Sequence, residues 1–291
     1  MVIEDELLKI VVCPQCRGLL ELRKNVLHCQ LCNYDYPIKR HIPILTSYSQ
    51  TQLRRDTHLF YETAATKDDV FDSKFTRIEV LKSKLIDSII KERTFDYVLD
   101  IGSAEGPHTR LLKKVSNNLI AMDISIQRLY KFKNKYNVTD LCVRADVEEL
   151  PFKENAFDFV LMTEVLEHVP DNKTSLRLIR DCLSIKGILL ITVPNNEEIS
   201  PNRDQAATEL GIDLPINGHL HSYTKDSLKQ MMKTLGFNVL EIREVFTRKP
   251  PYLGRFIPER FARLIPEVAG KLFCYSHIYC LATKGNEGER N

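Results

Sequence analysis

Four of the eight cysteines in the chain lie within its first 32 residues, and their spacing restricts what this end of the protein can fold into. They form two Cys-x-x-Cys pairs separated by twelve residues. Two such pairs joined by a short spacer fit one tetrahedral zinc ion held by four thiolates. Because a closed four-cysteine site has no open coordination position, we expect a structural rather than a catalytic metal. The predicted zinc ligands are Cys13, Cys16, Cys29 and Cys32.

A short apolar segment follows the second cysteine pair, with the sequence Tyr36-Pro37-Ile38 and then Ile42-Pro43-Ile44-Leu45. This pattern resembles the zinc ribbons of methyltransferase activator proteins, although His41 replaces the glycine that is usual in that family. The resemblance implies a four-cysteine ribbon over residues 1–46, which either activates a separate methyltransferase or is fused in front of one. A unit of this size buries little apolar surface, so a bound Zn²⁺ would supply much of its stability. Its nearly balanced charge does not favour RNA binding.

The composition of the whole chain limits its function class. The 291 residues allow one large domain and one small one, and a hydrophobic content of 43% can fill a core, which excludes general disorder. The net charge of +2 argues against a protein that binds nucleic acid over its whole surface. No apolar run is long enough to predict a transmembrane helix, and acidic residues stand where a signal peptide would be basic. We therefore expect a cytoplasmic protein.

Apolar runs alternate with helical stretches from Phe95 onward, an order typical of a parallel sheet covered by helices on both faces. Residues 47–93 precede this region as a linker with leading helices, and apolar residues recur at helical spacing between Thr76 and Arg93. We expect the α/β domain itself to cover residues 94–291. The predicted strands are 97–100, 119–123, 141–145, 157–162 and 188–193, and the predicted helices are 109–115, 126–136 and 174–183.

Acidic residues stand at the ends of the first three predicted strands, at Asp100, Asp123 and Asp146. The loop after the first strand, Asp-Ile-Gly-Ser-Ala-Glu-Gly, has two glycines that let the backbone turn tightly and approach a ligand. It is neither a P-loop, since no Gly-Lys-Ser/Thr follows, nor the dinucleotide pattern, since Ala104 replaces a required glycine. The second acid can bind ribose hydroxyls, and the third can accept a hydrogen bond from an adenine amino group. These acids predict a nucleoside-containing ligand at the carboxyl ends of the strands.

These segments, with "AMDIS", "ADVEELPF" and "GILLITVPN", resemble class I S-adenosylmethionine-dependent methyltransferases of the ubiquinone/menaquinone-biosynthesis type. The resemblance implies a Rossmann-like, seven-stranded, mostly parallel sheet in the order 3-2-1-4-5-7-6, with the last strands at 238–246 and 277–283. Ala104 stands where the family usually has glycine, and because alanine is small we expect cofactor binding to survive. The residues that the resemblance assigns to S-adenosylmethionine are Asp100, Gly102, Ser103, Gly106, Asp123, Ile124, Asp146, Val147 and Thr163.

A further polar cluster has the sequence Glu-Val-Leu-Glu-His, from residue 164 to residue 168. Its spacing predicts three polar groups on one face of a helix, and transfer to a hydroxyl requires a general base. With a distant histidine, the pattern resembles the divalent-metal site of small-RNA 3′-terminal 2′-O-methyltransferases, which implies Mg²⁺ or Mn²⁺. The alternative is a recurring packing and capping pair. The ligands implied for the metal are Glu164, Glu167, His168 and His219. The candidate catalytic residues are Glu164, His168, His219 and His221. His221 and Tyr223 either line the acceptor pocket or only fix its loop.

Residues 247–271 carry six basic and two acidic residues, interleaved with aliphatic and aromatic ones. Such a segment could make a peripheral contact with an anionic membrane, hold an anionic substrate or bind RNA backbone. The plain alternative is a solvated helix that packs on the domain.

The favoured interpretation is a methyltransferase that O-methylates a small or carrier-linked metabolite, such as a quinone, sugar, secondary metabolite or lipid-linked glycan. The first alternative is an RNA methyltransferase that acts on an rRNA base or a ribose 2′-oxygen. The second is a non-catalytic partner module that combines the ribbon with a cofactor-binding fold.

Overall fold

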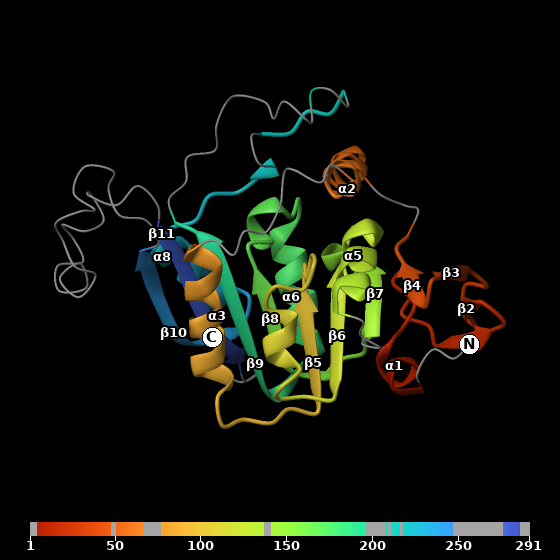
Figure 1. The fold of residues 1–291 in the computed structure, drawn as a ribbon, viewed down its shortest axis with the longest axis horizontal. Coiled ribbons are helices and arrows are strands. Elements are labelled where there is room, and N and C mark those ends of the chain that lie inside the picture. Colours follow the sequence, from red (N-terminus) through yellow and green to blue (C-terminus); the bar gives the residue numbers. More distant parts are fainter. Residues whose placement is uncertain are drawn as a thin grey trace.

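The computed structural model describes residues 5–47, 51–66, 77–136, 141–195, 208, 211–215, 218–246 and 276–285. A twisted sheet runs through the centre of the molecule, and the N-terminal segment adds to one of its edges (Figure 1). The basic segment at 247–271 lies outside the described residues, so its predicted contacts stay predictions. Within the described part of the chain, no helix is long and apolar enough to cross a membrane.

Seven strands form the main sheet in the order β7-β6-β5-β8-β9-β11-β10. Read in chain order, this is the predicted 3-2-1-4-5-7-6, and β11 runs antiparallel to both of its neighbours. The predicted fold class is therefore confirmed. The strands are β5 (Tyr97–Ile101), β6 (Asn118–Asp123), β7 (Leu141–Ala145), β8 (Phe157–Thr163), β9 (Leu183–Pro194), β10 (Phe237–Phe246) and β11 (Ser276–Lys284).

Helices cover both faces of this sheet because successive strand residues point to opposite sides. On one face, Val98 and Phe159 pack with residues of α3 (Arg77–Ile90) and with Leu112 of α4. On the other face, strand residues pack with α6 (Asn172–Cys182) and α8 (Lys225–Thr234). The remaining helical segments are α2 (Gln52–Ala64), α4 (Thr109–Leu112), α5 (Ile126–Tyr136), and the 3₁₀ turns η1 (Val147–Glu149) and η2 (Leu166–His168).

The N-terminal segment continues the main sheet. Its last strand pairs in parallel with β7, with Ile44 opposite Arg144 and Leu45 opposite Ala145, so the complete sheet has eleven strands. The core also crosses this junction, since Leu7 and Leu27 belong to the same apolar cluster as the main strands. The elements are α1 (Asp5–Ile10), β1 (Leu20–Arg23), β2 (Val26–Cys29), β3 (Asp35–Lys39) and β4 (Ile42–Leu45), and the four strands pair antiparallel in chain order.

Some predicted elements differ from the structure. The helix expected over residues 164–168 is wrong, because β8 ends at Thr163, Glu164 then has a φ of 52°, and only the short η2 turn follows. The predicted helix 109–115 ends at Leu112, and β9 begins at Leu183 rather than at residue 188. The positive φ at Glu164 reorients its side chain relative to the residues that follow, with consequences for the site.

Candidate functional site

The loop between β5 and α4 has a conformation that requires its two glycines. Gly102 and Gly106 have φ values of 68° and 76°. A Cβ on Gly102 would lie 2.3 Å from Val165, and one on Gly106 would lie 2.2 Å from the Phe132 ring. Any side chain at either position would therefore meet both backbone strain and a steric clash.

Asp100 is the penultimate residue of β5 and lies at the base of this loop. Its carboxylate accepts a 2.6 Å hydrogen bond from the Thr109 hydroxyl, at the start of α4. Burial raises the pKa of Asp100 to about 6, although Thr109 and the nearby His108 favour the ionised form. Asp100 therefore fixes the two ends of the loop relative to each other.

Asp123 at the end of β6 supports the same loop from the neighbouring strand. One carboxylate oxygen accepts a 2.9 Å hydrogen bond from the Ala104 amide, and the other accepts a 2.8 Å bond from the Ser125 amide. Ala104 has a φ of 47°, which costs a non-glycine residue roughly 1 kcal/mol. The alanine is thus accommodated at the position usual for glycine. Burial raises the pKa of Asp123.

Asp146 follows β7 and completes a row of three buried carboxylates at the carboxyl ends of adjacent strands. Helix α2 contacts this residue with two of its side chains. Arg54 donates to Asp146 Oδ2 at 2.6 Å, and His58 Nε2 lies 2.8 Å from the same oxygen. Burial opposes ionisation of Asp146, but His58 and Arg54 outweigh it and lower the pKa of Asp146.

Helix α2 also contacts the segments that follow β6 and β7, and these contacts were not predicted from the sequence. The Arg54 guanidinium lies 2.9 Å from Glu149 and 3.3 Å from Glu148, and Glu62 accepts a 3.0 Å hydrogen bond from the Ile126 amide. Arg54, His58 and Glu62 recur at steps of four and therefore lie on one face of α2. This spacing is the feature of the sequence from which the contacts could have been predicted. Figure 1 shows α2 lying beyond the strand ends that carry the acids.

The remaining residues assigned to the cofactor line the same edge of the sheet. The backbone amide of Ser103 donates to Met122 at the end of β6, whereas its buried hydroxyl has no hydrogen-bond partner among the described residues. An unsatisfied buried hydroxyl in this loop fits a polar ligand group. Val147 is the first residue of η1, and Thr163 is the last residue of β8, opposite Thr192 of β9. The carbonyl of Ile124 accepts a 2.9 Å hydrogen bond from the Arg144 side chain.

Glu164 lies apart from the residues with which the metal hypothesis grouped it. Its carboxylate accepts from the Thr192 hydroxyl at 2.8 Å and lies 3.0 Å from His277 Nε2 of β11 and 3.7 Å from Lys82 Nζ of α3. Burial opposes ionisation, but Lys82 and His277 lower the pKa of Glu164 to about 2. The contact with His277 was not predicted from the sequence.

The other three predicted metal ligands do come together. One donor atom from each of Glu167, His168 and His219 lies within 4.8 Å of the others. His168 Nδ1 lies 3.1 Å from the carbonyl of Gly218, which leaves Nε2 facing Glu167 at 3.7 Å. Burial lowers the pKa of His168 to about 4, so its imidazole is neutral at neutral pH and can bind a cation.

His221 and Tyr223 fix the loop that carries His219. His221 Nε2 lies 2.9 Å from the carbonyl of Val169, and the Tyr223 hydroxyl accepts from Asn172 at 2.8 Å and donates to the carbonyl of Leu166 at 3.3 Å. These contacts favour the positioning alternative for both residues.

The four N-terminal cysteines converge as predicted, with all sulfurs within 4.8 Å of one another. Cys16 and Cys29 are 3.4 Å apart, Cys13 and Cys32 are 3.8 Å apart, and the Tyr36 hydroxyl lies 3.1 Å from Cys13 Sγ. A Cβ on Gly18 would approach Cys29 Sγ to 3.0 Å, so the turn around the sulfurs requires glycine. Four convergent thiols fit a tetrahedral zinc ion.

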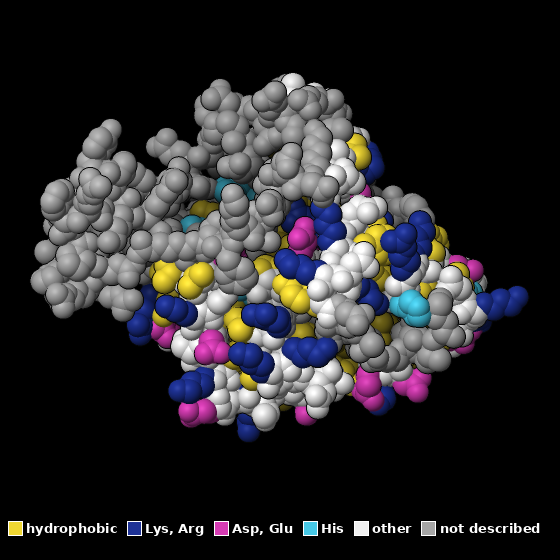
Figure 2. Space-filling model, viewed as in Figure 1, with side chains coloured by type: hydrophobic (Ala, Val, Ile, Leu, Met, Phe, Trp, Pro, Cys, Tyr) yellow, Lys and Arg dark blue, Asp and Glu magenta, His cyan; other side chains and the backbone are white. Residues whose placement is uncertain are grey.

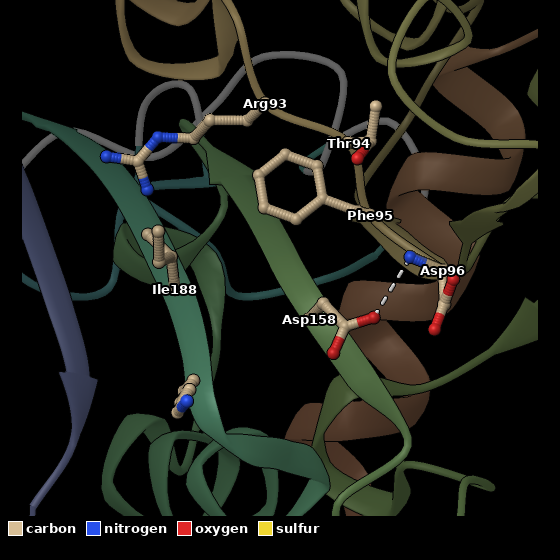
Figure 3. A pocket seen from close by; sticks show the side chains of 7 residues that line it. Arg93, Thr94, Phe95, Asp96, Asp158 and Ile188 are labelled. Carbon is tan, nitrogen blue, oxygen red and sulfur yellow. Dashed lines mark hydrogen bonds between the residues drawn. The ribbon is translucent and has the colours of Figure 1, made fainter.

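A pocket of about 490 Å³ lies elsewhere, at the amino ends of β5 and β8 and within β9 (Figure 3). Phe95 and Ile188 line it, and Asp158 accepts a 3.1 Å hydrogen bond from the Asp96 amide. The pocket thus lies at the opposite ends of the strands from the three acids, and no predicted site residue lines it.

Comparisons with known proteins agree with this geometry. The family model of the methyltransferase domain matches residues 76–242. The mitochondrial arginine-hydroxylase NDUFAF5 of Danio rerio is 32% identical over 166 residues, which cover 55% of this chain and 51% of that protein. A probable S-adenosylmethionine-dependent methyltransferase of Mycobacterium tuberculosis is 28% identical over 144 residues, 48% of each chain. The chain thus spans about half the length of these curated relatives.

A solved complex between the Haloferax volcanii Trm112 methyltransferase activator and a methyltransferase contains a chain of similar fold. Its TM-score is 0.57 at 16% identity, and the match covers 79% of this chain and 98% of that one. The family match, the strand order and the glycine loop lead to one conclusion: this chain belongs to the methyltransferase-domain family and has its class I, Rossmann-like fold.

Proposed function

We propose that the chain is an S-adenosylmethionine-dependent methyltransferase that transfers the methyl group to an oxygen of a small or carrier-linked metabolite. The observation that carries the proposal is the row of buried carboxylates at the ends of β5, β6 and β7, beside a glycine loop with an unsatisfied hydroxyl at Ser103. When bound, the cofactor supplies an electrophilic methyl group on its sulfonium sulfur.

Each acid has a proposed binding task. Asp123 would accept hydrogen bonds from the ribose hydroxyls, and Asp146 would accept one from the adenine amino group. The loop at Ser103 would hold the methionine end. Arg54 and His58 of α2 contact Asp146, so adenine would share that carboxylate with them or displace them. In either case α2 would cover the adenine end and exclude water from it.

The described surface supports a small acceptor over RNA. Lys and Arg side chains are spread over the face in Figure 2, with acidic side chains among them. Two cations near the carboxyl ends of the strands are already compensated, since Arg54 contacts Asp146 and Lys82 contacts Glu79 and Glu164. RNA binding depends chiefly on cations available to phosphates.

A methyl-transfer assay tests the proposal. Purified protein and S-adenosylmethionine labelled on its methyl group are incubated with a small-molecule extract or with total RNA. We expect label in an organic-extractable product, loss of that label in Asp123→Ala, and no loss in the matched exposed variant Asp226→Ala. Label in RNA would support the alternative substrate class, and no transfer to either pool would contradict the enzymatic proposal.

We also propose that Glu167, His168 and His219 hold a divalent cation beside the acceptor. The supporting observation is the convergence of one carboxylate and two imidazoles, one of which is held neutral by burial. Imidazole ligands favour Mn²⁺ over Mg²⁺, which prefers oxygen donors and water. Such a cation would polarise an acceptor hydroxyl and lower its pKa.

Manganese binding is measured by electron paramagnetic resonance on zinc-loaded protein. We expect one bound Mn²⁺ in the wild type and none in His219→Ala, whereas the matched loop variant His221→Ala retains it. Equal binding by His219→Ala and the wild type would contradict this site.

A further inference from the structure

We infer that Arg17 of the zinc ribbon is a positioning residue for the adenine end of the cofactor site, and that metal binding in the ribbon is thereby coupled to cofactor affinity. The inference rests on the proposed function in one respect, namely that the cofactor binds beside Asp146. The supporting observations are hydrogen bonds from the zinc ribbon to the two segments of the backbone that flank residues 146–149.

Arg17 belongs to the turn that the first cysteine pair closes. Its φ is 62°, its amide donates to the Cys13 carbonyl at 2.9 Å, and the Cys13 amide donates to the Gly18 carbonyl at 2.9 Å. Arg17 directly follows Cys16, a proposed ligand. An ion held by the four cysteines would therefore fix the backbone from which the Arg17 side chain extends.

The Arg17 guanidinium contacts the loop of the methyltransferase domain that follows Asp146. It donates to the carbonyl of Leu150 at 2.6 Å and also to the carbonyl of Phe152. The Val12 amide donates to the intervening carbonyl of Pro151 at 2.9 Å. The ribbon thus satisfies three successive carbonyls, and the planar guanidinium bonds two of them at once from two nitrogens held in a fixed geometry.

The ribbon also holds the other end of the same segment. Strand β4 pairs with β7 as far as Leu45 opposite Ala145, the residue immediately before Asp146. Residues 146–149 lie between these two attachments and make a 3.1 Å hydrogen bond from the Glu149 amide to the Asp146 carbonyl. The segment that would contact adenine is therefore anchored before and after by the ribbon.

Loss of the Arg17 contacts would loosen one end of this segment, which would then be held there only by backbone hydrogen bonds such as that from Val12 to Pro151. Cofactor binding would then have to order residues that are already ordered in the wild type, and each ordered residue has an entropic cost. Because coupling between two binding sites is reciprocal, cofactor binding would raise the zinc affinity by the same factor by which zinc raises the cofactor affinity.

Calorimetry with S-adenosylhomocysteine on zinc-loaded Arg17→Met tests the positioning role. We expect affinity to fall by about fivefold or more, since charged hydrogen bonds to two carbonyls are lost. Zinc content should stay at one per chain, and Arg17→Lys should recover part of the affinity. The matched control is Arg23→Met, an exposed ribbon arginine that pairs with Glu21. Unchanged affinity in Arg17→Met would overturn the inference.

A measurement on the wild type keeps the test decisive even if Arg17→Met does not fold. Zinc affinity is determined by competition with a chromophoric chelator, with and without saturating S-adenosylhomocysteine. We expect the ligand to raise zinc affinity severalfold. Equal zinc affinity in a protein that binds S-adenosylhomocysteine would refute the coupling alone, whereas a wild type that does not bind S-adenosylhomocysteine would refute the proposed function.

Discussion

Replacing Arg54 by methionine should destabilise the protein strongly at alkaline pH and less at mildly acidic pH. One guanidinium lies within 3.3 Å of three carboxylates, those of Asp146, Glu148 and Glu149. The Arg54 side chain is 11% exposed and the carboxylates are 6–18% exposed, so water screens them little. Removing one partner of a buried ion pair typically costs 3–5 kcal/mol, and we expect about 3 kcal/mol at pH 8.

The pH dependence follows from the acids left behind. Burial and the charge of Asp146 already raise the pKa of Glu148 to about 7 while Arg54 opposes them. Without Arg54 this pKa rises further, so the folded variant binds a proton more readily than the unfolded chain does. An acid with a raised folded-state pKa destabilises above that pKa, and the penalty is relieved as pH falls through it. The variant should therefore recover part of its stability between pH 8 and pH 6.

Urea unfolding followed by far-ultraviolet circular dichroism measures both effects, because the chain has no tryptophan for fluorescence. The control is Arg55→Met, an exposed arginine of the same helix, which should change stability by less than about 0.5 kcal/mol. A loss below about 1 kcal/mol in Arg54→Met, or a loss that is equal at both pH values, would refute the reasoning.

Three further outcomes are expected. Gly106→Ala should lower the free energy of unfolding in urea by about 2–4 kcal/mol, because φ is 76° and the new Cβ would clash with the Phe132 ring. The control is Gly211→Ala, since Gly211 has a similar φ and no neighbour within 4 Å of an added Cβ. A loss in Gly106→Ala no larger than in this control would mean that the clash is relieved. The ionised Glu164, with a pKa of about 2, should contribute on the order of 2 kcal/mol above pH 4.5 and lose it as pH falls toward 2. Acid titration of stability should therefore be flatter in Glu164→Gln, and identical curves would argue against the ion pairs with Lys82 and His277. Chelation of zinc should lower the melting temperature and added Zn²⁺ should restore it; an unchanged melting temperature would show that the ribbon is stable without metal.

The main strands and the row of acids at their ends could be predicted from the sequence because both follow from local patterns, whereas the strand order was implied by the resemblance to class I methyltransferases. Apolar runs mark the buried strands, and parallel strands bring their carboxyl ends to one edge, where Asp100, Asp123 and Asp146 then meet. The cysteine spacing was equally informative, since two Cys-x-x-Cys turns leave few other arrangements for four thiols.

Contacts between distant segments could not be predicted in this way. The pairing of Glu164 with His277 depends on β11 running antiparallel beside β9 and on a positive φ at Glu164, and neither has a local signature. The reach of Arg54 to Asp146 and of Arg17 to Leu150 depends on how the N-terminal segments dock on the edge and end of the sheet. Each of these arginines resembles an ordinary surface cation in the sequence.

Calorimetric titration of the wild type and of Asp123→Ala with S-adenosylhomocysteine measures whether the acids at the strand ends bind a nucleoside cofactor. We expect one ligand per chain for the wild type, and binding abolished in Asp123→Ala while zinc content and circular dichroism are retained. Absence of binding by the folded wild type, or equal affinity in the two proteins, would contradict the assignment of the acids at the strand ends to a nucleoside cofactor.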